Sequence, residues 1–324
     1  MLSRRGFIKG AAVAAVGTMV GVPARPAVAG PSAKVSRQVP GYFRLPVGDI
    51  EVTALYDGGV TIPAKILHGA TPQEIDVLLR DACIDPEQGL PTAINAFLVN
   101  TGNHLLLVDT GAGTAFGDKG GLLPGNIRAA GYDPREIGVV LLTHLHSDHA
   151  LGLTDGAGRA VFPQARVRAA AAEAAYWLGP DAEQRIPEAQ RKMLPAIKAA
   201  LAPYQEAGRF STFAPGETPA QGVEAVALAG HTPGHTGYRL ASKGQGILFW
   251  GDIVHGMAVQ FPRPEVSIDF DIDQPAAVAT RTALMKSLAK GNEWVAGAHL
   301  PFPGLGHLRQ AGAGYAWCPA LYAG

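Results

Sequence analysis

The heptad Thr143-His144-Leu145-His146-Ser147-Asp148-His149 is the most informative part of the sequence, and it directly follows an apolar run, 139–142, typical of a buried strand. Residues two apart in an extended segment face the same side, so His144 and His146 can bind one ion together. If the chain then turns into a helix, Asp148 and His149 face a second ion nearby. Imidazole and carboxylate are ligands for zinc and similar divalent metals. The heptad therefore predicts a two-metal centre at the end of a strand.

Three later segments supply further candidate ligands. His231-Thr232-Pro233-Gly234-His235 follows a predicted strand at 223–228, and we expect His235 to be the third nitrogen on the first ion. Asp252 ends the strand 247–250, where its carboxylate is expected to bridge both ions. His299, after a predicted last strand at 295–298, is expected to complete the second site. Each feature alone is weak, but this order together with the heptad is specific.

The charge of such a centre points to hydrolysis. Two divalent ions, two aspartates and one bridging hydroxide leave a net charge of about +1, which stabilises the oxyanion of an attacked carbonyl or phosphoryl group. Binding to a metal ion can lower the pKa of a water molecule to about 7. Asp148 is placed to carry a proton to the leaving group. We therefore expect Asp148 and Asp252 to be catalytic residues.

The composition fits a compact protein with an uncharged ligand. The chain has 324 residues, of which 47% are hydrophobic and 17% charged. Residues 1–30 hold four of the 27 basic groups and none of the 27 acidic ones, which leaves about −4 on the rest. No basic field attracts nucleic acid or anionic lipid. Cys83 and Cys318 do not form a disulfide framework, and we expect buried thiols.

The N-terminus has the features of an export signal. Ser3-Arg4-Arg5-Gly6-Phe7-Ile8-Lys9 resembles the twin-arginine motif, an apolar run follows at 10–22, and Ala27-Val28-Ala29 is a small-x-small cleavage site. The run is short for a membrane span. We expect residues 1–29 to be a cleaved signal peptide, which leaves a periplasmic or secreted protein with no membrane attachment.

Strands and helices interleave along 30–324, which predicts one α+β domain whose sheets are covered by helices. Gly48-Asp49 indicates a hairpin turn, and Thr71-Pro72-Gln73-Glu74 is a capping box that begins a helix ending near residue 82. Residues 169–208 are Ala-rich with helical periodicity and form a helical insertion between the ligand motifs. A helix is also expected near 275–290.

These motifs, in this order, resemble the metallo-β-lactamase superfamily, and the resemblance spans most of the chain after the signal. It implies an αββα fold, a two-sheet sandwich flanked by helices. It also implies that His144, His146 and His235 hold one ion, and that Asp148, His149 and His299 hold the other, with Asp252 shared. Asp109 in Val108-Asp109-Thr110-Gly111 matches a family aspartate that orients a liganding histidine.

Other classes fit the sequence less well. There is no second Asp-Thr-Gly for an aspartic protease and no Gly-x-Ser-x-Gly for a serine hydrolase. Within the superfamily, oxygen-reducing diiron proteins, the non-hydrolase alternative, typically place Glu where this chain has His146. Zinc β-lactamases usually have another residue at Asp252. Thioesterases of the glyoxalase II type add a helical domain after the last ligand, and only 25 residues follow His299.

The resemblance is closest to methyl parathion hydrolase and its lactonase and aryl-esterase relatives, through Gly41-Tyr42-Phe43-Arg44, the ligand motifs and residues 299–304. Phe116 and Trp177 match aromatic pocket walls, although Trp177 fits a core position equally well. Near Met193 the chain lacks an aromatic residue of the phosphotriesterase. His255, Ile268 and Phe270 stand where that enzyme has an apolar or smaller residue, and His255 too could be structural.

These departures favour a lactone or aryl ester as the main substrate, with phosphotriester hydrolysis as a secondary activity. Methyl parathion-type phosphotriesterase as the main activity is the alternative. We expect a small, neutral, apolar substrate and a homodimer. Zn²⁺ is the expected metal, with Mn²⁺, Co²⁺ or Fe²⁺ also compatible with N/O ligands.

Overall fold

The computed structural model describes residues 34–35 and 38–322. Contacts divide the chain into Met1–Gln38 and one compact unit, Val39–Gly324. The signal peptide expected at 1–29 lies outside the described residues. Among the residues that are described, no helix is long and apolar enough to cross a membrane.

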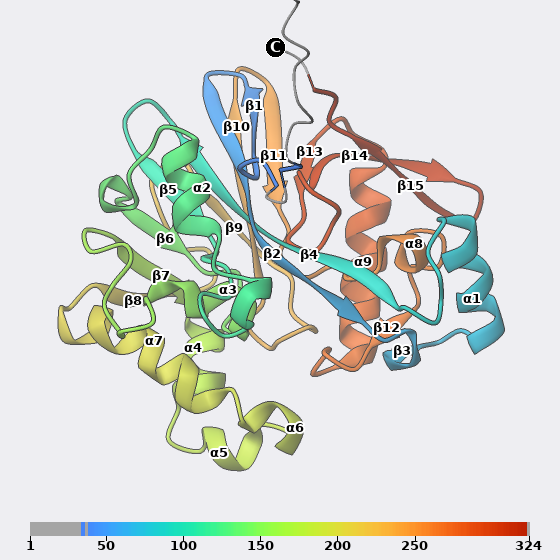
Figure 1. Cartoon of the computed structure of the whole chain (residues 1–324), viewed down its shortest axis with the longest axis horizontal. Helices are drawn as coiled ribbons and strands as arrows, with labels where there is room; N and C mark the ends of the chain where they lie inside the picture. The colour runs from blue at the N-terminus through green and yellow to red at the C-terminus, as the bar shows by residue number, and fades with distance from the viewer. Residues whose placement is uncertain (1–33, 36–37, 323–324) are drawn as a thin grey trace, which may run out of the picture. The chain divides into compact units, whose positions relative to one another are not determined.

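Two large β-sheets form the centre of the unit (Figure 1). The first has seven strands, in the spatial order β1 (Tyr42–Val47), β2 (Ile50–Ile62), β4 (Leu90–Asn100), β5 (Leu105–Val108), β6 (Val139–Leu141), β7 (Arg166–Ala170) and β8 (Phe210–Phe213). The second has six, in the order β15 (Gly314–Pro319), β14 (Leu305–Ala311), β13 (Trp294–Ala296), β11 (Gln245–Phe249), β10 (Thr236–Ser242) and β9 (Glu224–Ala227). A small ladder pairs β3 (Leu67–His68) with β12 (Ser267–Ile268).

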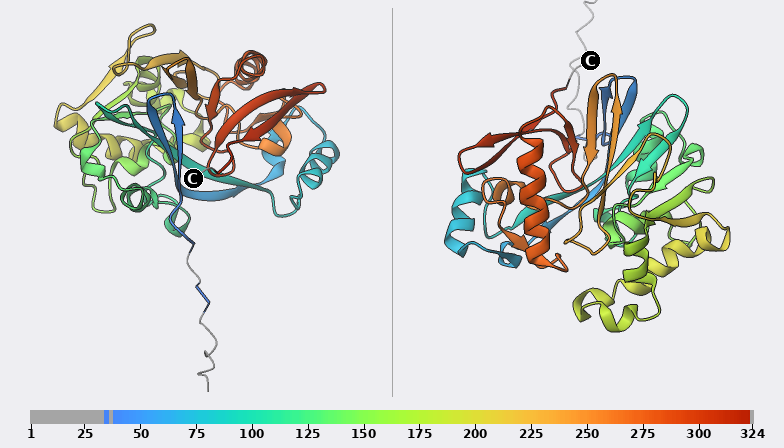
Figure 2. Two further views of the ribbon diagram at one scale, coloured as in Figure 1. Left: turned by 90° about the horizontal axis from the view of Figure 1, so that it is seen from above. Right: turned by 180° about the vertical axis from the view of Figure 1, so that it is seen from behind.

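Helices cover the outer faces of both sheets (Figures 1 and 2). The first sheet is covered mainly by α2 (Leu123–Ala129), α4 (Ala171–Leu178) and α7 (Leu194–Glu206). The second is covered by α9 (Gln274–Leu288). The remaining helices are α1 (Pro72–Asp81), α3 (Ser147–Ala150), α5 (Ala182–Arg185), α6 (Glu188–Arg191) and α8 (Met257–Gln260).

Strict alternation of side chains along the strands explains the layers. In β4, Phe97 and Val99 lie in the core between the sheets, whereas Leu98 points outward to the helices of the first sheet. In β11, Phe249 joins the same central core and Leu248 packs toward α9. Successive strand residues face opposite sides of a sheet, so each apolar strand serves two layers. The predicted αββα fold is confirmed.

Local predictions agree with the structure at several elements. Gly48, with φ +61°, forms the turn between β1 and β2. The Thr71 side chain caps α1 with the reciprocal Glu74 contact of a capping box. The helices of the insertion are α4 to α7. Beyond the sandwich, the long β2–β4 ladder reaches α1, where a separate apolar cluster forms (Figure 2).

Two expectations about the chain are wrong. The strand at β13 is not the last one, because β14 and β15 follow it and form a hairpin at the edge of the second sheet. The cysteines are not both buried, because Cys83 lies exposed in the left-handed turn after α1 and Cys318 is half-buried on the edge strand β15.

Candidate metal centre

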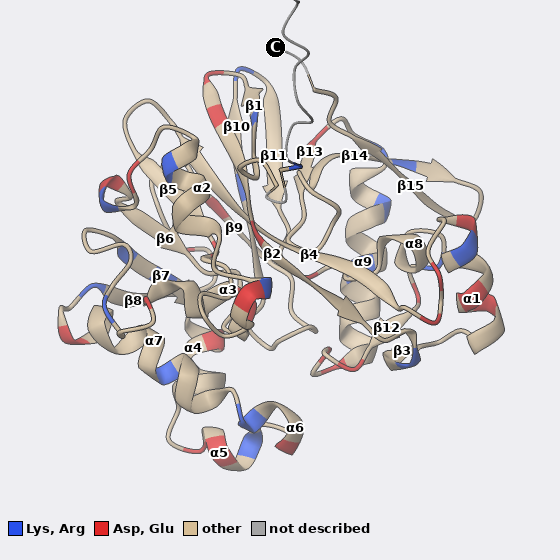
Figure 3. Cartoon of the chain, viewed as in Figure 1, with Lys and Arg blue, Asp and Glu red and all other residues tan. Residues whose placement is uncertain are grey.

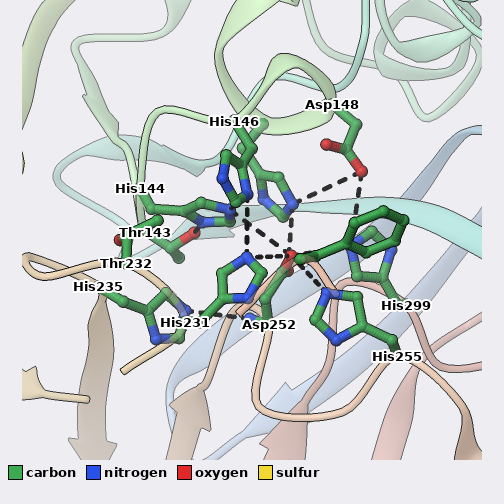
Figure 4. A network of polar contacts seen from close by, with 12 residues as sticks. Thr143, His144, His146, Asp148, His231, Thr232, His235, Asp252, His255 and His299 are labelled. Carbon is green, nitrogen blue, oxygen red and sulfur yellow. Dashed lines mark hydrogen bonds and ion pairs between the residues drawn. The ribbon is translucent and has the colours of Figure 1, made fainter. Parts of the chain in front are cut away.

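The ligand residues gather where strands of both sheets end (Figure 4). The heptad follows β6, and the chain turns into α3 directly after His146, as expected. The loop with His231 lies between β9 and β10, Asp252 follows β11, and His299 follows β13. Segments more than 150 residues apart therefore meet at one edge of the sandwich.

Four side chains form the first cluster, and their candidate ligand atoms lie within 4.8 Å of one another: His144, His146, His231 and Asp252. The His146 Nδ1 atom lies 3.0 Å from His144 Nε2 and 2.9 Å from His231 Nε2. The Asp252 Oδ2 atom lies 3.5 Å from His144 Nε2 and 3.2 Å from His231 Nε2. Three imidazole nitrogens and one carboxylate oxygen thus point at a common position.

Asp148, His149 and His299 form the second cluster. The Asp148 Oδ2 atom lies 3.8 Å from His149 Nε2 and 3.5 Å from His299 Nε2. Asp252 is shared with this cluster, since its Oδ1 lies 3.1 Å from His149 Nε2 and its Oδ2 lies 3.1 Å from His299 Nε2. The Asp252 carboxylate therefore stands between the two clusters, as predicted.

The contacts within both clusters fit bound cations better than internal hydrogen bonds. His149 Nε2 and Asp252 Oδ1 are buried and lie 3.1 Å apart, but they are not aligned for a hydrogen bond. Neither atom has a hydrogen-bond partner within the described part of the chain. Buried polar atoms are rarely left unpaired. A tetrahedral ion with Zn–N bonds of 2.0–2.1 Å separates its donors by roughly 3.3 Å. The separations between donor atoms in the first cluster range from 2.9 to 3.5 Å and therefore include that value. The nitrogen and oxygen donors also suit zinc and related metals.

His235 is not part of the first cluster, which corrects the sequence prediction. Its Nδ1 lies 3.0 Å from the Leu228 carbonyl oxygen, to which it donates, and its Nε2 accepts a 3.0 Å hydrogen bond from the Asp252 backbone N–H. Neither ring nitrogen is left for an ion. His231, four residues earlier, takes the position that we had assigned to His235.

Asp109 supports ligands of both clusters. Its Oδ2 accepts hydrogen bonds from His149 Nδ1 at 2.8 Å and from the Thr143 hydroxyl at 2.9 Å. That hydroxyl lies 3.0 Å from Nδ1 of His144. Asp109 has φ +60°, a left-handed conformation that costs free energy for a residue with a side chain and is tolerated best by Asp and Asn. The carboxylate is held beneath the heptad by these contacts and by the Thr143 backbone N–H, which donates to Oδ1 at 2.8 Å.

Two more groups orient ligand histidines, and no motif in the sequence predicts either of them. Asp271 is buried, and its Oδ1 lies 2.9 Å from His231 Nδ1. The Ala93 carbonyl oxygen on β4 lies 2.8 Å from His299 Nδ1. A hydrogen bond on the second ring nitrogen fixes which nitrogen is free for a metal.

Burial and neighbouring carboxylates set the charge of the histidines. Burial holds the pKa of His144 and His146 well below the usual value, so both rings are neutral and able to bind a metal. Burial also disfavours charge on His231, but Asp252 and Asp271 outweigh it and raise its pKa to about 9. For Asp252, burial opposes ionisation, yet the surrounding histidines hold its pKa well below 3.8. Anionic charge is thus concentrated where cations are expected.

A cavity of about 450 Å³ opens onto both clusters. Its walls include Val60, Ile62, Ala189 and Lys192, together with the predicted pocket residues Phe116, Met193, His255 and Phe270. His255 is buried, with Nε2 3.2 Å from Asp252 Oδ2.

Two predicted pocket residues do not line this cavity. Trp177 is fully buried in the core of the first sheet, and its indole N–H donates to Glu173 at 2.8 Å. Ile268 packs into the apolar cluster beside α1. Trp177 is a core residue that packs edge-on against the ring of His146 without lining the cavity, and Ile268 is a core residue of the apolar cluster beside α1.

Known proteins agree with this fold and site. The sequence profile described as "Metallo-beta-lactamase superfamily" matches residues 89–299, which include every residue of the two clusters. The chain belongs to the metallo-β-lactamase superfamily. Together with the histidine and aspartate clusters, this membership makes it a metal-dependent hydrolase. No curated protein matches the chain.

Several solved structures are similar. The hydrolase AbOPH, "in beta lactamase superfamily", is 41% identical with a TM-score of 0.86, over 89% of this chain and all of that one. AidC, a dizinc quorum-quenching lactonase solved with a product, is 26% identical with a TM-score of 0.80, over 88% of this chain and 99% of that one. A probable metal-dependent hydrolase from Staphylococcus aureus shares the fold at 20% identity and a TM-score of 0.64, over 79% of this chain and 91% of that one.

Proposed function

We propose that the protein is a dinuclear metal-dependent hydrolase that cleaves lactones or aryl esters, with phosphotriesters as secondary substrates. The observation that best supports this is the mainly apolar cavity of about 450 Å³ that opens directly onto both clusters. When bound, a pair of divalent ions supplies a nucleophile at neutral pH and positive charge for a developing oxyanion.

The residues of the two clusters have distinct tasks in this proposal. His144, His146 and His231 would hold one ion and Asp148, His149 and His299 would hold the other, with Asp252 available to both clusters. Zn²⁺ suits these nitrogen and oxygen donors. Asp148 lines the cavity and has a side chain that is 20% accessible, whereas Asp252 is 3% accessible. Asp148 is therefore the carboxylate that can meet a leaving group and transfer a proton to it.

The cavity walls favour a small neutral substrate. Most of the wall area is apolar, and outside the two clusters the charged lining residues are one lysine, Lys192, and one carboxylate, Asp269. Charged side chains of both signs are also interspersed over the surface elements (Figure 3). A lactone is further supported by AidC, a lactonase of similar fold that was solved with a homoserine product.

A kinetic panel on the metal-loaded protein tests the proposal. The substrates are dihydrocoumarin, acyl-homoserine lactones, aryl esters and paraoxon. We expect the highest kcat/KM on a lactone or aryl ester, and a variant Asp252→Ala without hydrolysis. A highest value on paraoxon would instead make phosphotriester hydrolysis the main activity. Oxygen consumption without any hydrolysis would replace the proposal with a redox function.

A further inference from the structure

Glu173 is a buried carboxylate in the helical insertion that lies between the two loops of the first cluster. It stands in the first turn of α4 and is fully inaccessible to solvent. Burial raises its pKa, while its hydrogen bonds act in the opposite direction. Burying a carboxylate costs free energy unless specific hydrogen-bond partners offset it, so the partners of Glu173 indicate what it does.

Four neutral donors surround this carboxylate. Oε1 accepts hydrogen bonds from the Leu145 backbone N–H at 2.9 Å and from the Trp177 indole at 2.8 Å. Oε2 accepts from the Thr232 hydroxyl at 2.6 Å and from the Gly234 backbone N–H at 3.1 Å. Leu145 lies between the ligands His144 and His146, and Thr232 directly follows His231. One side chain thus ties together the two loops that supply all the histidines of the first cluster.

The same contact depends on close approach of the backbone. A Cβ atom on Gly234 would lie 2.1 Å from the Glu173 backbone nitrogen, so no side chain fits there. The start of α4 therefore rests directly on the loop 232–235. This packing makes the distance between the two loops depend on Glu173.

The orientation of the His146 ring depends more on packing than that of the other two histidines in the first cluster. Its Nδ1 faces the cluster, and its buried Nε2 has no hydrogen-bond partner among the described residues. By contrast, the second nitrogens of His144 and His231 contact Thr143 and Asp271. The His146 ring instead packs against Trp177, with ring centroids 5.5 Å apart in an edge-on arrangement. Glu173 holds both that indole and the Leu145 N–H beside His146.

From this geometry we infer that Glu173 is a positioning residue for the first metal site: it fixes His146 relative to His231 and adds negative charge beside the cations. The inference rests on the proposed dinuclear centre. Glu173 bonds to residues beside His146 and His231 rather than to their rings, and it therefore belongs to the groups that orient ligands from outside, whose loss typically lowers metal affinity about 10–100-fold. The second cluster, which Glu173 does not contact, should be almost unaffected.

The test measures Zn²⁺ affinity of each site separately, by competition with a chromophoric chelator. A His299→Ala background isolates the first site, and a His231→Ala background isolates the second. We expect Glu173→Gln to lower affinity about 10–100-fold in the first background and less than about 3-fold in the second. Equal losses in both backgrounds, or no loss in the first, would overturn the inference.

A milder pair of variants covers the case in which Glu173→Gln does not fold. Thr232→Val removes one hydrogen bond to Glu173. Thr236→Val, at the start of β10, removes instead a buried threonine hydrogen bond to the Gly234 carbonyl. Only Thr232→Val should lower the Zn²⁺ affinity of the first metal site. Equal losses of affinity in Thr232→Val and Thr236→Val would contradict a specific role for Glu173. If the unmodified chain binds no Zn²⁺ at either site, the proposed function itself fails, which is a separate result.

Discussion

Each histidine of the centre has two ring nitrogens, and its role follows from what the second nitrogen contacts. His149, His231 and His299 each use Nδ1 in a contact with an oxygen, so that Nε2 faces a cluster. His235 has both nitrogens occupied by backbone groups. The sequence motif correctly predicted a histidine ligand in the loop before β10, but we assigned it to His235 and not to His231. Hydrogen bonds to distant backbone groups decide which of the two rings has a nitrogen available for a metal, and the sequence does not show them.

Alanine at His231 should lower the metal content, whereas alanine at His235 should lower the stability of the fold. His231→Ala removes a ligand, so we expect the bound metal to fall from two ions per chain toward one. His235→Ala keeps both ions but leaves the buried Asp252 N–H and Leu228 carbonyl unpaired, which should lower the free energy of unfolding by roughly 2–5 kcal/mol. Metal analysis and urea unfolding measure the two effects, and the reverse pattern would restore His235 as the ligand.

Asp109→Asn isolates the charge of a residue that supports both sites. Asn tolerates the left-handed backbone at φ +60°, so the substitution adds little strain. We expect metal affinity to fall 10–100-fold, most at the second site, because Asp109 contacts the second-site ligand His149 directly. Asp109→Ala should additionally destabilise the fold. Unchanged Zn²⁺ affinity in Asp109→Asn would show that the carboxylate does not support the ligands.

At the scale of elements, the strands were predictable where the chain carries an unbroken apolar run and not where polar residues interrupt it. The run predicted as a strand at 247–250 is β11, observed at Gln245–Phe249. The edge hairpin β14–β15 was missed, because Arg309 and Gln310 are exposed and the pattern is weak. Beyond Gly306, β14 pairs only with the edge strand β15, so this part of the hairpin is less constrained by burial.

The helix α7 is fastened to the first sheet's outer core by the phenol of Tyr204, and this contact should be lost in alkali. The hydroxyl donates to the Leu153 carbonyl at 2.9 Å and accepts from the Phe162 N–H at 3.2 Å. Burial raises the Tyr204 pKa from 10.0 to about 12. The stability from the protonated phenol is therefore complete below pH 10 and is lost as the pH rises to about 12.

Unfolding of the wild type and Tyr204→Phe at a series of pH values measures this contribution. We expect the difference in unfolding free energy between them to shrink by roughly 2–3 kcal/mol between pH 10 and pH 12. A difference that stays constant over this range would mean that Tyr204 titrates alike in the folded and unfolded chain.

At the scale of the folded unit, strands of both sheets end at the same edge and bring the ligand segments together. The types of most ligands followed from the sequence, because a liganding residue directly after a strand keeps a recognisable spacing. Asp109 followed from the family resemblance, but the other supporting groups did not, since Asp271, Glu173 and the Ala93 carbonyl act through contacts between distant segments. The homodimer and the twin-arginine export remain proposals. N-terminal sequencing of exported protein tests cleavage after Ala29.

Removal of the metals should destabilise the whole unit. Each ion that binds only the folded state stabilises it by about 4 kcal/mol when present at a thousand times its Kd, so two ions contribute about 8 kcal/mol. For a unit of this size, that corresponds to a fall in Tm of roughly 15 °C on addition of a chelator. Scanning calorimetry measures it, with His231→Ala as a control that should show a smaller fall. Identical Tm values with and without chelator would contradict a structural metal centre.

The most direct test of the account is an anomalous scattering measurement on crystals of the zinc-loaded protein, on both sides of the zinc absorption edge. The account predicts two peaks, one among His144, His146 and His231 and one among Asp148, His149 and His299, with Asp252 between them. A single peak, or one bound by His235 in place of His231, would contradict it.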